Sequence, residues 1–134
     1  MRIKAFLLLL FIAFSFNSFS QQVEKFRAYE SLLILTGGAK NTWQQTDILI
    51  TLSRSDKKLK IYTSNPISID FVKFVSTGKV EDGISSTYKG VDDNGNECLV
   101  MMSTYDNPSG DLIGSLLINY VDSKIAYAYR IKKN

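Results

Sequence analysis

The chain has 134 residues, no histidine and a single cysteine. Without histidine it cannot form a Ser–His or Cys–His catalytic pair or an imidazole zinc site, and one cysteine can form neither an internal disulfide nor a thiolate metal cage. The formal net charge is +3, with no concentrated basic patch, so we expect no nucleic-acid partner. Three possibilities remain for the function of the chain: catalysis by carboxylates, a calcium site, or no chemical activity.

Residues 1–20 have the pattern of a cleavable secretory signal. Two basic residues precede an apolar run from Ala5 to Phe16, and small serines precede the expected cut after Ser20. The run is about a dozen residues, shorter than the roughly 20 that a membrane-spanning helix needs. We therefore predict an exported protein, periplasmic or extracellular and not membrane-embedded. Its mature part is residues 21–134, a single domain with 14 Lys and Arg against 13 Asp and Glu.

Strand signals separated by turn residues recur about every ten residues along the mature chain. Residues 23–35 fit a strand or an amphipathic helix; the apolar run at their end favours a strand, and the helix stays as the alternative. Residues 47–53 and 58–63 alternate apolar and polar side chains around the polar turn 54–57. They predict a β-hairpin.

The segment after Asn65-Pro66 predicts a strand with an irregularity. Ile67, Ile69 and Phe71 fall on one face, and the apolar positions then change parity to Val72 and Phe74. One inserted residue explains such a change, so we predict a β-bulge near Phe71-Val72.

Residues 84–91 and 97–104 predict a second hairpin. A three-residue loop, 93–95, with Gly95 in the left-handed conformation pairs Gly90 with Cys98 and Tyr88 with Val100, which gives one coherent inner face. A two-residue loop would mix polar and apolar side chains on that face. The preferred register also predicts that Cys98 is a buried, reduced thiol.

Residues 112–120 and 124–132 predict the last hairpin, with Tyr127 and Tyr129 on its apolar face and the loop at 121–123. The whole pattern predicts an all-β domain of about eight antiparallel strands in meander order. We expect a small up-and-down barrel, with a two-sheet β-sandwich as the alternative. Bulky side chains look sufficient to fill the interior of a small barrel: Phe26, Phe71, Phe74, Tyr88, Tyr127 and Tyr129.

Several features together resemble short exported β-proteins of unknown function of the Bacteroidetes type. They are the signal end at Ser18-Phe19-Ser20-Gln21, Trp43 shortly before the strand at 47–50, the Lys60-Ile61-Tyr62 strand, the hairpin containing Asp92, Asn94, Gly95 and Cys98, and the Tyr-rich last strand. The resemblance implies an exported small β-domain and brings no catalytic residues.

The acidic loop from Asp92 to Glu97 places oxygen ligands at alternate positions, as calcium loops do. Its glycine is the fourth residue and its glutamate the sixth, which departs from the EF-hand spacing. Asp, Asn and Gly are also the ordinary residues of a turn. We therefore predict a turn and no metal site. Most other carboxylates also lie in turns, and Asp70 alternates toward solvent, so we predict no catalytic residues, no cofactor and no enzyme activity.

Trp43 is the one candidate for a contact surface. It stands in a polar stretch with Asn41, Gln44 and Gln45, and an indole beside side-chain amides suits a sugar or a peptide. We favour the other interpretation of Trp43, in which the ring packs on the core or begins a strand; if the protein binds a sugar or a peptide, we expect the contact surface at these four residues. We predict an exported binding or interaction module whose partner is a protein or a glycan. A small-ligand carrier with an apolar barrel interior is the main alternative, and a carboxylate-based glycan-active enzyme is a third.

Overall fold

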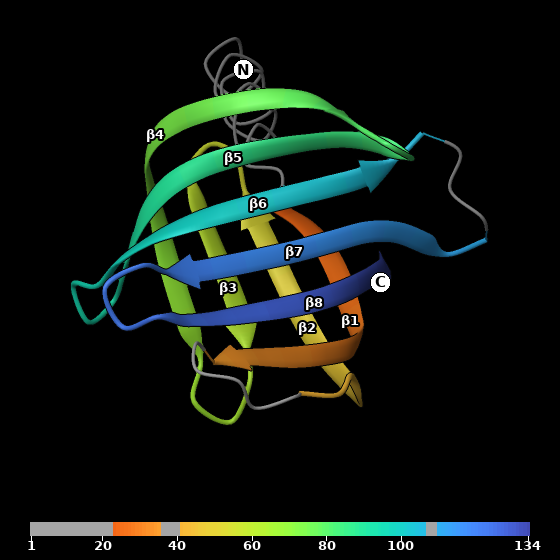
Figure 1. Cartoon of the computed structure of the whole chain (residues 1–134), viewed down its shortest axis with the longest axis horizontal. Helices are drawn as coiled ribbons and strands as arrows, with labels where there is room; N and C mark the ends of the chain where they lie inside the picture. The colour runs from red at the N-terminus through yellow and green to blue at the C-terminus, as the bar shows by residue number, and fades with distance from the viewer. Residues whose placement is uncertain (1–22, 36–40, 107–109) are drawn as a thin grey trace, which may run out of the picture.

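The computed structural model describes residues 23–35, 41–106 and 110–134. Every neighbouring pair of strands is antiparallel and follows chain order, and the first strand also pairs with the last, which closes a barrel (Figure 1). The predicted all-β meander barrel is confirmed, the sandwich alternative is wrong, and residues 23–35 form a strand as predicted. The strands are β1 (Val23–Leu35), β2 (Gln44–Ser53), β3 (Lys58–Tyr62), β4 (Ile67–Val80), β5 (Gly83–Asp92), β6 (Glu97–Tyr105), β7 (Leu112–Tyr120) and β8 (Ile125–Lys133).

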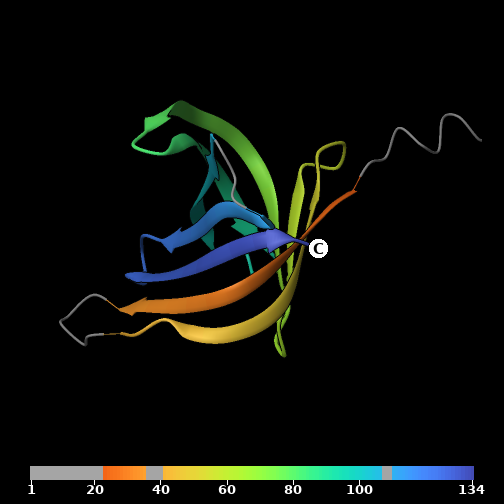
Figure 2. The ribbon, with the colours of Figure 1, turned by 90° about the vertical axis from the view of Figure 1, so that its right-hand side faces the viewer.

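The barrel is built from two walls whose strands cross. In Figure 1, β5 to β8 run across the front, and β2 and β3 run steeply behind them. The strands β1 and β4 bend from one wall into the other, and both carry register shifts: between Ala28 and Glu30 in β1, and after Phe71 and after Phe74 in β4. Because a bulge bends its strand, these shifts turn the corners of the barrel. Figure 2 shows the resulting curl of β4.

The bulge predicted near Phe71-Val72 is confirmed by the register shift between Phe71 and Lys73. Phe74 pairs with Tyr88, and their rings meet edge to face with centroids 5.4 Å apart. Val72 does not share that face as expected. It lies on the bulge, where its side chain is 65% exposed.

The β5–β6 hairpin has the predicted register, with Gly90 opposite Cys98 and Tyr88 opposite Val100. The amide of Asp92 donates to the carbonyl of Asn96 (2.9 Å), which encloses the three-residue loop. Gly95 has φ +83°, the left-handed conformation that glycine adopts without a steric penalty. Turn chemistry and strand alternation therefore determine this hairpin together.

The β7–β8 hairpin differs from the prediction by one residue in its loop. Tyr120 pairs with Ile125, so the loop has four residues, 121–124, and Lys124 takes a positive φ of 57°. The inward positions of β8 are unaffected, because Tyr127 and Tyr129 still face Ile118 and Leu116 of β7.

Aliphatic side chains fill the middle of the barrel and are almost completely buried. Cys98 belongs to this core, and it is a free, buried cysteine, as predicted. Within the described part of the chain, no helix is long and apolar enough to cross a membrane. The largest fully buried side chains are Ile50, Leu59, Ile61, Ile69, Val100, Leu116, Ile118 and Ile131.

Candidate functional site: the pocket at the barrel mouth

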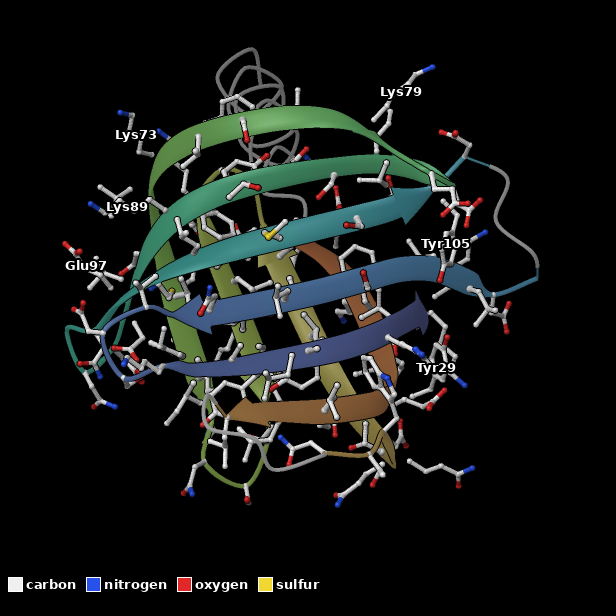
Figure 3. The ribbon with its side chains drawn as sticks, in the orientation of Figure 1. Tyr29, Lys73, Lys79, Lys89, Glu97 and Tyr105 are labelled. Atoms are coloured by element: carbon white, nitrogen blue, oxygen red, sulfur yellow. The ribbon has the colours of Figure 1, made fainter. Side chains whose placement is uncertain are left out.

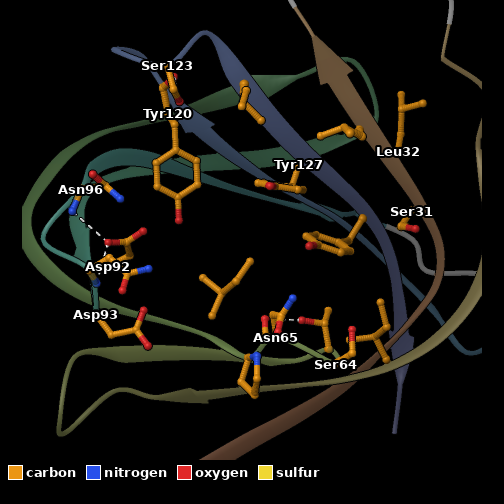
Figure 4. Close-up of a pocket in the computed structure, with 18 of the residues that line it drawn as sticks. Ser31, Leu32, Ser64, Asn65, Asp92, Asp93, Asn96, Tyr120, Ser123 and Tyr127 are labelled. Carbon is orange, nitrogen blue, oxygen red and sulfur yellow. Dashed lines mark hydrogen bonds between the residues drawn. The ribbon is translucent and has the colours of Figure 1, made fainter.

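A pocket of about 1140 Å³ opens at one end of the barrel (Figure 4). The turns that join β3 to β4, β5 to β6 and β7 to β8 surround it, together with the end of β1 and the start of β2. In Figure 4, Asp92 and Asn96 lie on one side of the pocket, and Ser31 and Leu32 of β1 lie on the other. The aliphatic core stops below this mouth, so the interior is not filled along its whole length.

Three tyrosines from β7 and β8 form the wall and floor of the pocket: Tyr120, Tyr127 and Tyr129. Strand alternation directs Tyr127 and Tyr129 to the same inward face, and Tyr120 projects inward from the end of the neighbouring strand. The rings of Tyr120 and Tyr127 are perpendicular, with centroids 6.2 Å apart. Ile48 and Ile67 complete an apolar lower surface.

The hydroxyl of Tyr129 has no protein partner among the described residues. The residue is only 3% exposed. No side-chain oxygen or nitrogen in the described ranges is both sealed from solvent and unpaired, so this hydroxyl must reach the pocket that Tyr129 lines. Burial and the nearby Tyr127 raise the pKa of Tyr129 to about 12. At neutral pH the pocket floor therefore offers a protonated hydroxyl that can donate or accept a hydrogen bond.

The carboxylate of Asp92 holds the rim of the pocket together. Its Oδ1 accepts hydrogen bonds from the amides of Asn94 (3.0 Å) and Asn96 (2.8 Å), and the side chain of Tyr120 lies near this carboxylate. Burial raises the pKa of Asp92, but the hydrogen bonds from Asn96 and Asn94 and the nearby Tyr120 hydroxyl outweigh it, and the net pKa is lowered. The side chain is thus an ionised acceptor that holds the turn in place.

These bonds are those of an aspartate-stabilised turn, so they support the turn interpretation of the 92–97 loop. Across the described residues, no group of three or more His, Cys, Asp or Glu side chains is placed to hold a metal ion.

The described lining of the mouth carries negative charge. Its lining includes four carboxylates, and no described lining residue is Lys or Arg. The charge of Glu97 is partly neutralised, because its Oε2 lies 3.8 Å from Nζ of Lys89. Figure 3 shows these two residues close together near the end of the β5–β6 hairpin. The four carboxylates belong to Asp92, Asp93, Glu97 and Asp122.

The four residues predicted as a contact surface do not share one face. Asn41 and Gln44 line the pocket, whereas Gln45 is exposed on the outer wall opposite Glu30. Trp43 is half-buried just before β2, and the guanidinium carbon of Arg130 lies 4.2 Å from the centre of its ring. Arg130 also donates to Glu30 at 3.2 Å. Trp43 is therefore covered by a cation on the outside of the barrel and is not among the residues that line the pocket.

The expectation that large side chains fill the interior is confirmed only in part. Tyr129 belongs to the buried core, and Phe26, Phe71 and Tyr127 pack against it. Tyr127 and Tyr129 nevertheless line an open pocket, and Phe74, elsewhere on β4, is 52% exposed. Alternation identified the inward positions, but it carries no information on how far apart the opposite walls stand. The sequence did contain one indication of a pocket. Tyrosines occupy inward positions close to a turn, and a tyrosine hydroxyl inside a barrel needs a polar partner or solvent.

Asp70 lies on the outer wall, as its alternation predicted, with its carboxylate 3.6 Å from Nζ of Lys58. A smaller pocket of about 380 Å³ adjoins the β4–β5 turn, lined by Glu81, Asp82, Tyr105 and Asp106.

Comparison with known proteins finds no matching family model, no matching curated protein and no matching solved structure.

Proposed function

We propose that the protein is an exported, non-enzymatic binding protein that takes a small molecule into the pocket at the barrel mouth. The observation that carries this proposal is Tyr129, a residue that is nearly buried and whose hydroxyl has no partner in the described residues and opens onto a pocket of about 1140 Å³. Because this hydroxyl opens onto the pocket, water can pair with it when the pocket is empty of ligand. A ligand that forms a hydrogen bond there takes the place of that water, and the hydroxyl then fixes the ligand's orientation.

The composition of the pocket supports binding over catalysis. Pockets for small molecules combine an apolar, aromatic surface with a few polar groups that fix orientation, and here tyrosine and isoleucine side chains are ringed by amides and hydroxyls. Asp92 is occupied by the turn, and its lowered pKa makes it a poor general acid near neutral pH. The chain contains no histidine that could take that role. Export is proposed on the pattern of residues 1–20.

The test is a fragment screen by amide NMR on the isotopically labelled protein, with neutral, cationic and anionic fragments and simple sugars at millimolar concentration. We expect binders to shift the amide signals of Tyr120, Tyr127 and Tyr129 together. Ser31 faces Tyr129 across the β1–β8 pairing and should respond with them.

Gln44→Trp and Gln45→Trp form a matched pair for this screen. Both residues are exposed and adjacent in sequence, but only Gln44 lines the pocket. Gln44→Trp should obstruct binding, and Gln45→Trp should leave it unchanged. A screen in which no fragment shifts the pocket signals would refute the proposal. Loss of binding in Gln45→Trp alone would instead place the site on the outer wall beside Trp43.

A further inference from the structure

We infer that the ligand of this pocket is an organic ammonium ion with an apolar or aromatic body. The inference rests on the proposed function, because it names the chemical class that the same pocket selects. Three independent features of the pocket support it: its charge, its aromatic surface and the unpaired hydroxyl of Tyr129.

The charge of the lining selects against anions and favours cations. Four carboxylates face the mouth with no lysine or arginine among the described lining residues. Two nearby lysines are not part of that lining: Lys124, which belongs to the β7–β8 loop, and Lys89, which lies on β5 and pairs with Glu97. A concave site lined by one sign of charge concentrates the field and raises the local concentration of ions of opposite sign.

The aromatic surface distinguishes an organic cation from a metal ion. The faces of tyrosine rings attract ammonium groups electrostatically, and Tyr120 and Tyr127 present two perpendicular rings on one side of the pocket. Ile48, Ile67 and Ile125 add apolar surface that a hydrated metal ion would not use. An ion that carries a hydrocarbon body gains from both kinds of surface.

The hydroxyl of Tyr129 supplies the polar contact. It is protonated at neutral pH, it has no hydrogen-bond partner among the described residues, and it lies near Tyr127 in the lining of the pocket. Its oxygen can accept an N–H bond from a primary or secondary ammonium group. The ionised carboxylate of Asp92 lies near Tyr120, lines the same pocket and provides the countercharge.

Three probes with the same phenyl ring and different charge test the inference: phenethylammonium, 2-phenylethanol and phenylacetate. Their dissociation constants are measured by NMR titration of the full-length mature protein at neutral pH. We expect phenethylammonium to bind about tenfold or more tightly than 2-phenylethanol, and phenylacetate to bind most weakly. The preference for the cation should shrink in about 0.3 M NaCl, because salt screens charges at a solvent-exposed mouth.

A pair of double variants separates the charge of the rim from the net charge of the protein. Asp93→Asn with Asp122→Asn removes two exposed carboxylates from the lining, whereas Asp47→Asn with Asp70→Asn removes two exposed carboxylates from the outer wall. The rim pair should weaken phenethylammonium binding several-fold and leave 2-phenylethanol unchanged. The outer pair should change neither affinity.

The outcomes also separate this inference from the proposed function. If 2-phenylethanol or phenylacetate binds in the pocket as tightly as phenethylammonium, the ligand class is wrong and the proposal of a binding pocket stands. If both double variants weaken the cation equally, the rim has no specific role and the inference fails. If no probe and no fragment of the screen reaches the pocket, both the inference and the proposed function are wrong.

Discussion

Gly114 provides the sharpest test of the barrel geometry. It lies on β7 opposite Thr104 of β6, and a Cβ added there would come to 1.8 Å from the carbonyl oxygen of Ser103 and 3.0 Å from Cα of Thr104. Both are backbone atoms that no side-chain rotation can move. Gly114→Ala must therefore push the two strands apart by about 1 Å and weaken nearby ladder bonds. Overpacking costs about 1–3 kcal/mol and each lost hydrogen bond about 1 kcal/mol.

We expect Gly114→Ala to lower the free energy of unfolding by about 3 kcal/mol, which is roughly 10–20 °C in melting temperature for a domain of this size. Urea unfolding followed by far-ultraviolet circular dichroism measures it. Gly78→Ala on β4 is the control, because no atom lies within 4 Å of the added Cβ. That variant should match the parent protein or exceed it by up to about 1 kcal/mol. Equal urea midpoints for the two variants would refute the strand spacing described here.

Burial raises the pKa of Cys98 to about 11, so a thiol reagent should label it slowly in the native protein and rapidly in urea; rapid native labelling would show that the faces of β6 are reversed. The hydrogen bonds to Asp92 outweigh its burial and lower its pKa, so the stability they add is present above about pH 4 and is lost as the pH falls through the folded value. Asp92→Ala should remove this acid dependence, and the melting midpoint should be the same in millimolar calcium and in chelator; a calcium shift that Asp92→Ala abolishes would establish a metal site. Intact-mass measurement of protein exported by its native host should show a chain that begins after Ser20, and a mass that retains residues 1–20 would contradict the export prediction.

Local patterns were enough to predict the strands and one register. Alternation and turn residues predicted the register of the β5–β6 hairpin correctly, because both select the same pairing. The loop that puts Gly95 in the left-handed conformation is also the one that directs Tyr88 and Cys98 to the inner face. The parity change after Phe71 predicted a bulge for the same reason. In each case the information lies within about ten residues of chain.

The pocket depends on distances that no local pattern contains. Three separate turns converge on it because β1 and β4 bend at their bulges and because β1 closes on β8. The second bulge in β4, after Phe74, leaves no parity signal as clear as the first. Tyr127 and Tyr129 follow the same alternation whether they fill an interior or border a pocket, so the sequence predicted their direction and not their surroundings.

The pairing of β1 with β8 also determines when the domain can fold. The bond from Arg130 to Glu30 joins residues 100 positions apart, so nearly the whole chain must be available before the barrel can close. Until then, β1 and β7 each expose a row of unpaired backbone groups that can pair with another chain. Pairings of such long sequence separation make folding slow. A chain truncated before β8 would therefore keep two unpaired edge strands and be prone to aggregate, rather than form a smaller barrel.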